Sequence, residues 1–78
     1  MKTLAQTVVN GNKVRIVEKR SEYDGDVMLY QAQTKRRGDR YFDDYGPECE
    51  TNDHAYYWAF EAIRCWFDDV IIDSQNGG

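Results

Sequence analysis

The sequence predicts an α+β fold, a three- to four-stranded antiparallel meander followed by one long C-terminal helix packed on the sheet. Residues 2–42 alternate apolar and polar side chains and are interrupted by glycine-containing turns, which is typical of antiparallel strands. Residues 52–72 repeat apolar side chains three and four positions apart, which is typical of a helix. Because 78 residues suit one domain, we expect a single domain with a loop over 43–51 and a frayed tail over 73–78.

The first hairpin is predicted by Asn10-Gly11, because both residues accept the positive φ angles of a type I′ turn. This turn sets the register, with Thr7 opposite Val14 and Ala5 opposite Ile16. One face of the pair then carries Ala5, Val9, Val14 and Ile16. The other face carries Gln6, Lys13 and Arg15, with Leu4 and Val17 at its far end.

Further turns divide the remaining strands. Asp24-Gly25 repeats the first turn signal between strands over 15–22 and 27–35. Residues 35–39 predict a third turn, and residues 40–42 a short fourth strand. Gly46-Pro47 favours a loop after it. Thr51, Asn52 and Asp53 can each cap the helix that follows.

The helix is more apolar than a monomeric surface helix requires. One apolar set comprises Tyr56, Phe60, Ile63, Phe67 and Val70, and a second comprises Ala55, Ala59, Ala62, Trp66 and Ile72. The polar side chains occupy a narrow stripe, His54, Glu61, Arg64 and Asp68. An ordinary surface helix needs an apolar stripe of only about 100°. Either the sheet wraps this helix closely, or a second molecule covers it, which predicts a homodimer or one large partner interface.

Charge is distributed unequally along the chain. The net charge is −4, but residues 1–40 sum to +4 and residues 41–78 to −8. Such asymmetry indicates charged partners. The alternative is that both charge biases belong to solvated surfaces.

No catalytic or metal signature is present, so we expect a non-enzymatic protein without cofactors. Cys49, His54 and Cys65 lack the closely spaced ligand pairs of structural zinc sites. Neither thiol is expected to be reactive, because Glu48 and Glu50 disfavour a Cys49 thiolate and burial in the helix would raise the pKa of Cys65. The start of the chain is polar and no apolar run approaches the ~20 residues of a membrane span. We therefore expect a cytoplasmic, reduced protein that does not contact membranes.

Two surfaces are candidates for function. An acidic and aromatic set predicts a protein-binding surface: Asp43, Asp44, Tyr45, Glu48, Glu50, Asp53, Tyr57, Trp58, Glu61 and Asp68. Tyr and Trp are enriched among interface hot spots, and many carboxylates on a scaffold can occupy a nucleic-acid groove of another protein. A basic set predicts direct nucleic-acid binding as the alternative: Arg15, Lys35, Arg36, Arg37 and Arg40, beside Tyr41-Phe42. The net negative charge favours the first.

A short meander followed by one helix, acidic and without an active site, is similar to several small phage-encoded inhibitors of host machinery, including anti-CRISPR proteins. The resemblance concerns architecture and transfers no functional residue. Meander-plus-helix modules also occur in antitoxins and RNA-binding domains. The resemblance implies a module that binds and blocks a larger, basic, nucleic-acid-handling complex.

Overall fold

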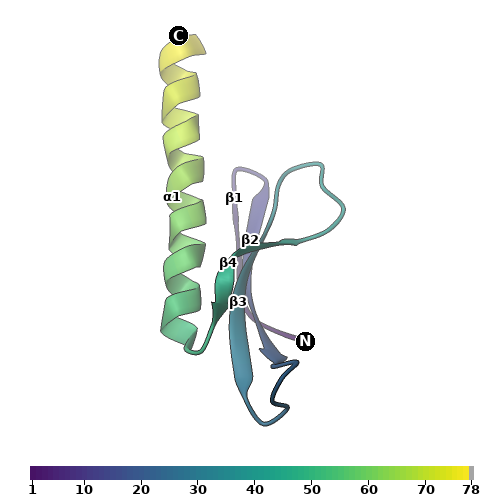
Figure 1. Cartoon of the computed structure of the whole chain (residues 1–78). Helices are drawn as coiled ribbons and strands as arrows, with labels where there is room; N and C mark the ends of the chain where they lie inside the picture. Colours follow the sequence, from purple (N-terminus) through teal and green to yellow (C-terminus); the bar gives the residue numbers. More distant parts are fainter. Residues whose placement is uncertain (78) are drawn as a thin grey trace.

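The computed structural model describes the backbone of residues 1–77 and the side-chain surroundings of residues 1–67. Its elements are β1 (Lys2–Val9), β2 (Asn12–Arg20), β3 (Met28–Lys35), β4 (Asp43–Cys49) and α1 (Asn52–Gly77). The strands form one antiparallel sheet in the order β1-β2-β3-β4. The helix lies against one face of this sheet, and its later turns extend past the strands (Figure 1). The predicted α+β meander with a C-terminal helix is confirmed.

The first hairpin has the predicted register. Asn10 and Gly11 take φ angles of 53° and 83°, as a type I′ turn requires. Thr7 pairs with Val14 and Ala5 with Ile16. The prediction that Leu4 lies on the face that carries Gln6 and Arg15 is wrong. An irregularity between Thr3 and Ala5 shifts the register there, and Leu4 packs against the helix-side core.

The second turn is longer than predicted. β2 ends at Arg20, and residues 21–27 form a loop in place of a two-residue turn at Asp24-Gly25. The Ser21 hydroxyl accepts hydrogen bonds from the backbone N–H groups of Tyr23 and Asp24, at 3.2 and 3.3 Å. These side chain–backbone bonds replace strand pairing and explain why the loop is longer.

The last strand lies where the sequence predicts a loop. β4 covers Asp43–Cys49, whereas residues 40–42, the expected fourth strand, belong to the connection before it. β4 is irregular: Tyr30 pairs with Cys49 and Ala32 with Tyr45, so residues 46–48 lie opposite the single residue Gln31. The Gly46-Pro47 signal therefore marks a bulge within a strand, which both residues are suited to form.

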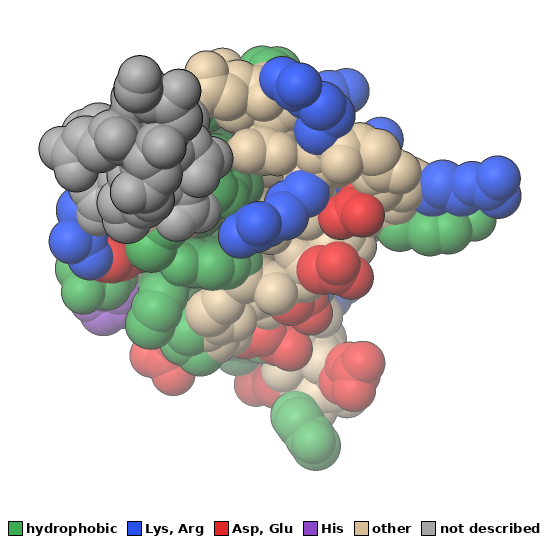
Figure 2. Space-filling view, turned by 90° about the horizontal axis from the view of Figure 1, so that it is seen from above, with side chains coloured by type: hydrophobic (Ala, Val, Ile, Leu, Met, Phe, Trp, Pro, Cys, Tyr) green, Lys and Arg blue, Asp and Glu red, His purple; other side chains and the backbone are tan. Residues whose placement is uncertain are grey.

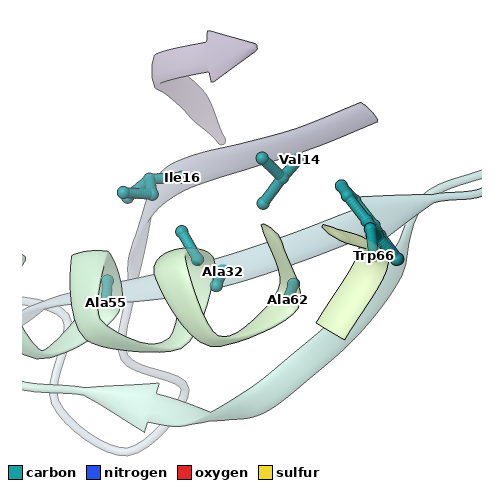
Figure 3. Close-up of a cluster of buried hydrophobic side chains, with 7 residues drawn as sticks. Val14, Ile16, Ala32, Ala55, Ala62 and Trp66 are labelled. Atoms are coloured by element: carbon teal, nitrogen blue, oxygen red, sulfur yellow. The ribbon is translucent and has the colours of Figure 1, made fainter. Parts of the chain in front are cut away.

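The core lies between the sheet and one face of the helix. Figure 3 shows the helical alanines Ala55 and Ala62 facing Ile16 and Ala32, with Trp66 beside Val14 at one end. Small side chains let the helix backbone approach the strands closely, and Trp66 fills the space at the end. Only the second predicted apolar set of the helix, Ala55, Ala59, Ala62 and Trp66, is buried. Ile72, the last member of that set, lies outside the residues whose side chains are described.

The helix begins as predicted and ends later. The Thr51 hydroxyl accepts a hydrogen bond from the His54 backbone N–H at 3.3 Å, so Thr51 is the N-cap among the three candidates. The helix continues beyond the expected end at Ile72 to Gly77, in place of a frayed tail. Gly78 lies outside the described residues.

Candidate protein-binding surface

The acidic residues of the predicted surface gather along β4, which is an edge strand of the sheet. Asp43 and Asp44 at its start, Glu50 just after it and Asp53 in the first helical turn are all exposed. Figure 2, which looks down on the molecule, shows acidic side chains (red) running down one side, with Lys and Arg (blue) mainly above and around them. Asp43 and Asp44 thus lie at one end of β4, and Glu50 and Asp53 lie at its other end, where the helix starts.

Aromatic side chains lie beside these carboxylates, and packing between the rings fixes their positions. Trp58 meets the Tyr45 ring edge-on at 6.4 Å between centroids and the Tyr57 ring edge-on at 5.5 Å. Tyr57 is 58% exposed, whereas Trp58 and Tyr45 are half-buried. Trp58 is therefore a support that fixes Tyr57, and Tyr57 is the aromatic side chain that a partner can reach.

The Trp58 ring packs against the β4 bulge. Gly46 has a φ of 79°, and a Cβ atom at this position would lie 2.5 Å from a Trp58 ring carbon. The Gln31 side-chain amide donates a 2.6 Å hydrogen bond to the Gly46 carbonyl, which the bulge leaves without a strand partner. Position 46 thus requires glycine for two reasons, its positive φ angle and the close approach of the Trp58 indole.

The strand register divides the acidic set between the two faces of the sheet. Asp43 and Tyr45 alternate towards the helix side, since Tyr45 lies opposite the buried Ala32. Asp44 points to the opposite face, where its carboxylate accepts a 2.9 Å hydrogen bond from the Gln33 side-chain amide. The candidate surface therefore wraps around the β4 edge.

Two of the predicted carboxylates are already engaged by basic side chains. Glu48 lies 3.6 Å from the Lys19 ammonium, and Glu61 lies 2.7 Å from the Arg64 guanidinium. Within the residues that the structure describes, no ion pair engages Asp43, Asp44, Glu50 or Asp53. These four carry the free negative charge of the surface. Asp68 lies outside the residues whose side chains are described.

Two groups near this surface, the Tyr45 phenol and the Cys49 thiol, have raised pKa values. Burial raises the pKa of the Tyr45 phenol, and the neighbouring Cys65 and Glu61 raise it further, while Arg64 lowers it. Burial also raises the pKa of Cys49. The expectation that Cys65 is buried is wrong, because its side chain is exposed and Cys49 is the buried thiol. Across the described residues, no three His, Cys, Asp or Glu side chains gather where they could hold a metal ion.

The basic residues meet at the Lys35 end of β3, the same end at which Asp43 and Asp44 pair with this strand, and two turns come together there. Lys13 lies directly opposite Lys35 in the β2–β3 ladder. The Arg37 guanidinium donates a 2.8 Å hydrogen bond to the Asn10 carbonyl, and its backbone N–H donates a 2.9 Å bond to the Asn12 side chain. These contacts define a small open pocket of about 120 Å³ lined by Gly11, Lys13, Lys35, Arg36, Arg37, Gly38 and Asp39.

The structure changes the membership of the basic set. Lys13 joins it through strand pairing, a contact that a search for charge runs along the chain does not detect. Arg15 is engaged elsewhere: its Nε donates a 2.9 Å hydrogen bond to Gln33, and its guanidinium carbon lies 3.9 Å from the centre of the Phe42 ring. Arg36 and Arg40 are exposed. Asp39 in the same pocket offsets part of the positive charge.

Comparison with protein-family models, with curated proteins and with solved structures gives no match. No helix among the described residues is both long enough and apolar enough to cross a membrane.

Proposed function

We propose that this protein is a non-enzymatic interaction module that binds a basic, nucleic-acid-handling protein complex through the β4 edge. The observation that carries the proposal is that the four carboxylates along the β4 edge have no ion pair among the described residues, and that the exposed Tyr57 lies one helical turn from Asp53. Unpaired carboxylates on a rigid strand can complement a basic groove, and a supported aromatic ring can anchor the contact. The module would then act by occlusion, as small phage-encoded inhibitors of the anti-CRISPR kind do.

Rigidity supports this proposal. Asp44 is held by Gln33, and Tyr57 is held by Trp58, which itself packs on Gly46. Groups that are already fixed lose little conformational freedom on binding, so more of the interaction energy appears as affinity. A charged surface on mobile side chains would lack this advantage.

The test is capture of the partner from cells of the source, using immobilised protein and a charge-matched control. The test variant carries Asp43→Lys and Glu50→Lys. The control carries Glu22→Lys and Asp26→Lys, exposed positions in the 21–27 loop that change the net charge equally. We expect the first pair to weaken capture, by up to roughly 1 kcal/mol per charge, and the control to preserve it. Equal loss in both variants would contradict the proposal.

Competition with nucleic acid adds a second readout. If the carboxylates occupy a nucleic-acid groove of the partner, short DNA or RNA should displace this protein from the captured complex. The protein itself should then bind no nucleic acid at tens of micromolar, as a fluorescence-anisotropy titration at low salt would measure.

A second candidate function is direct nucleic-acid binding, which the meeting of Lys13, Lys35, Arg36 and Arg37 around one pocket favours. Cations clustered at a turn can bind phosphates. In this case the protein alone should bind nucleic acid at micromolar concentration, and Arg36→Ala with Arg37→Ala should abolish that binding and flatten its salt dependence. That result would replace the first proposal.

A further inference from the structure

The β1 side of the molecule carries an apolar groove that the candidate binding surface does not use. It has a volume of about 140 Å³ and is lined mainly by apolar side chains, with Ala5 and Ile16 from the sheet and Tyr56, Phe60 and Ile63 from the helix among them. The groove exists because the helix packs on β2, β3 and β4 and leaves β1 largely uncovered. Phe60 at its rim is 63% exposed, and with the apolar groove lining it forms a contiguous exposed apolar patch of the kind that marks an interaction site.

The strand beside this groove has a free backbone edge. The two-residue turn makes Val9 and Asn12 a hydrogen-bonded pair, and such pairs alternate along an antiparallel ladder. The N–H and C=O groups of Gln6 and Val8 therefore point away from β2. No backbone hydrogen bond from the described residues reaches these groups. β1 can accept another antiparallel strand.

We propose that the chain forms a two-fold homodimer in which the β1 strands of two copies pair antiparallel and Phe60 of each copy closes the combined groove. This contact is independent of the function proposed for the β4 edge. An antiparallel contact between two identical strands is self-complementary, so each copy gives and receives the same groups. The result is an eight-stranded sheet with both helices on one face.

Charge favours a second copy over a charged partner. The only charged residue of β1 is Lys2, and antiparallel pairing about the strand centre separates the two Lys2 side chains. Arg15 is the only charged residue lining the groove, and its guanidinium is held by Gln33 and Phe42. A charged partner would find no free counter-charge here, whereas another uncharged, apolar surface matches.

The acidic β4 edges do not oppose this contact. They lie three strands from β1, at about 14 Å, and exposed charges are largely screened beyond about 8 Å at physiological salt. The repulsion between two copies of net charge −4 is therefore small at the β1 contact.

The available area indicates a reversible dimer. Eight residues of β1 span about 27 Å, and the side of a sheet and helix layer is about 20 Å wide, which gives roughly 500 Å² per copy. Stable interfaces bury about 600 Å² or more per partner. The contact thus falls just below the range of stable interfaces, where weak and transient ones lie, and we expect a dissociation constant in the micromolar range or weaker.

Sedimentation equilibrium of the full chain, from about 1 µM to about 500 µM, measures this association. We expect a reversible change from a 9.2 kDa monomer to a dimer. Phe60→Lys should raise the dissociation constant by at least about tenfold. Tyr23→Lys is the matched control, because Tyr23 is an exposed aromatic side chain in the 21–27 loop that does not line the groove, and this change should leave the constant within roughly twofold.

A second variant and a second readout keep the test decisive if Phe60→Lys fails to fold. Thr7→Lys places a charge on an exposed β1 position that faces the groove, and it should weaken the dimer in the same way. Backbone hydrogen exchange at Gln6 and Val8 should slow as protein concentration rises. A monomer at all concentrations, a dimer unaffected by both variants, or a dimer without slowed exchange at these amides would overturn the proposal.

Discussion

The two edge strands of the sheet, β4 and β1, differ in charge and in the regularity of their hydrogen bonding. β4 carries the carboxylates Asp43, Asp44 and Glu48, and the bulge at 46–48 with Pro47 interrupts its hydrogen-bonding pattern. Each of these features prevents another strand from pairing. β1 carries one charge, at Lys2, and regular pairing from Ala5 to Val9. The β4 edge thus attracts basic surfaces and rejects strands, whereas the β1 edge accepts a strand and attracts no charge.

This difference shows how a small domain can carry two interfaces that each select a different kind of partner. A partner that fits one edge lacks the chemistry required by the other. Changes confined to one edge should therefore leave the other function intact, because mutations that share no contacts usually have additive effects.

The largest expected effect comes from removing the glycine that forms the β4 bulge. Gly46→Ala should lower the free energy of unfolding by about 2–4 kcal/mol, because alanine at a φ of 79° is strained and its Cβ would overlap the Trp58 ring. Denaturant unfolding measures this loss. Near-ultraviolet circular dichroism would report the displaced Trp58.

Substitutions at two other glycines distinguish backbone strain from the Trp58 contact as causes of that loss of stability. Gly38 also has a positive φ, 91°, but a Cβ there meets nothing within 4 Å, so Gly38→Ala should show backbone strain alone, about 1 kcal/mol. Gly25 has neither constraint, and Gly25→Ala should stay within about 0.5 kcal/mol. Equal effects at Gly46 and Gly38 would refute the role of the Trp58 contact.

The two interfaces should also respond differently to salt. Raising sodium chloride from about 0.05 M to about 1 M should weaken partner binding at the β4 edge several-fold, because screening acts on exposed carboxylates. The β1 association rests on apolar burial and backbone hydrogen bonds, and its dissociation constant should stay constant or fall. Parallel titrations of the captured partner and of self-association measure both. A dimer that dissociates with salt would remove the distinction between the edges.

The sequence predicts the β1 side of the sheet better than the β4 side. Asn10-Gly11 sets the first hairpin through its own backbone angles, so the register of Ala5 and Thr7 follows from local residues. β4 depends on distant partners. Asp43, Asp44 and Gly46-Pro47 disfavour a strand by composition, and they form one because β3 pairs with them and Gln31 bonds the bulge.

The same limit applies to the sites. Periodicity predicts two apolar sets on the helix but not which of them is buried; the alanine set packs on the sheet because small side chains allow close approach, and this leaves Phe60 outside. The acidic residues are predicted by composition, whereas the Lys19–Glu48 pair requires the register of a strand that composition does not indicate. Lys13 was missed for the same reason, since only the ladder places it beside Lys35.

The smallest expected effect is a loss of folding stability at alkaline pH, and it arises at the β4 edge and not at the β1 edge. Cys49, the last residue of β4, is 6% exposed, and burial raises the pKa of its thiol, so the folded chain retains this proton where the unfolded chain releases it. Stability from this group is therefore complete below the ordinary thiol pKa of about 8.5 and decreases as pH rises above it, by at most about 1.4 kcal/mol per pH unit.

Cys49→Ala should remove part of the loss of stability between about pH 7.5 and about pH 9.5, as denaturant unfolding measures. Tyr45 adds a loss of the same sign at higher pH, since its pKa is also raised. The same substitution should leave the β1 association unchanged, because Cys49 does not line the groove. A pH dependence of stability that Cys49→Ala leaves unchanged would contradict the assignment of the alkaline loss to the end of β4.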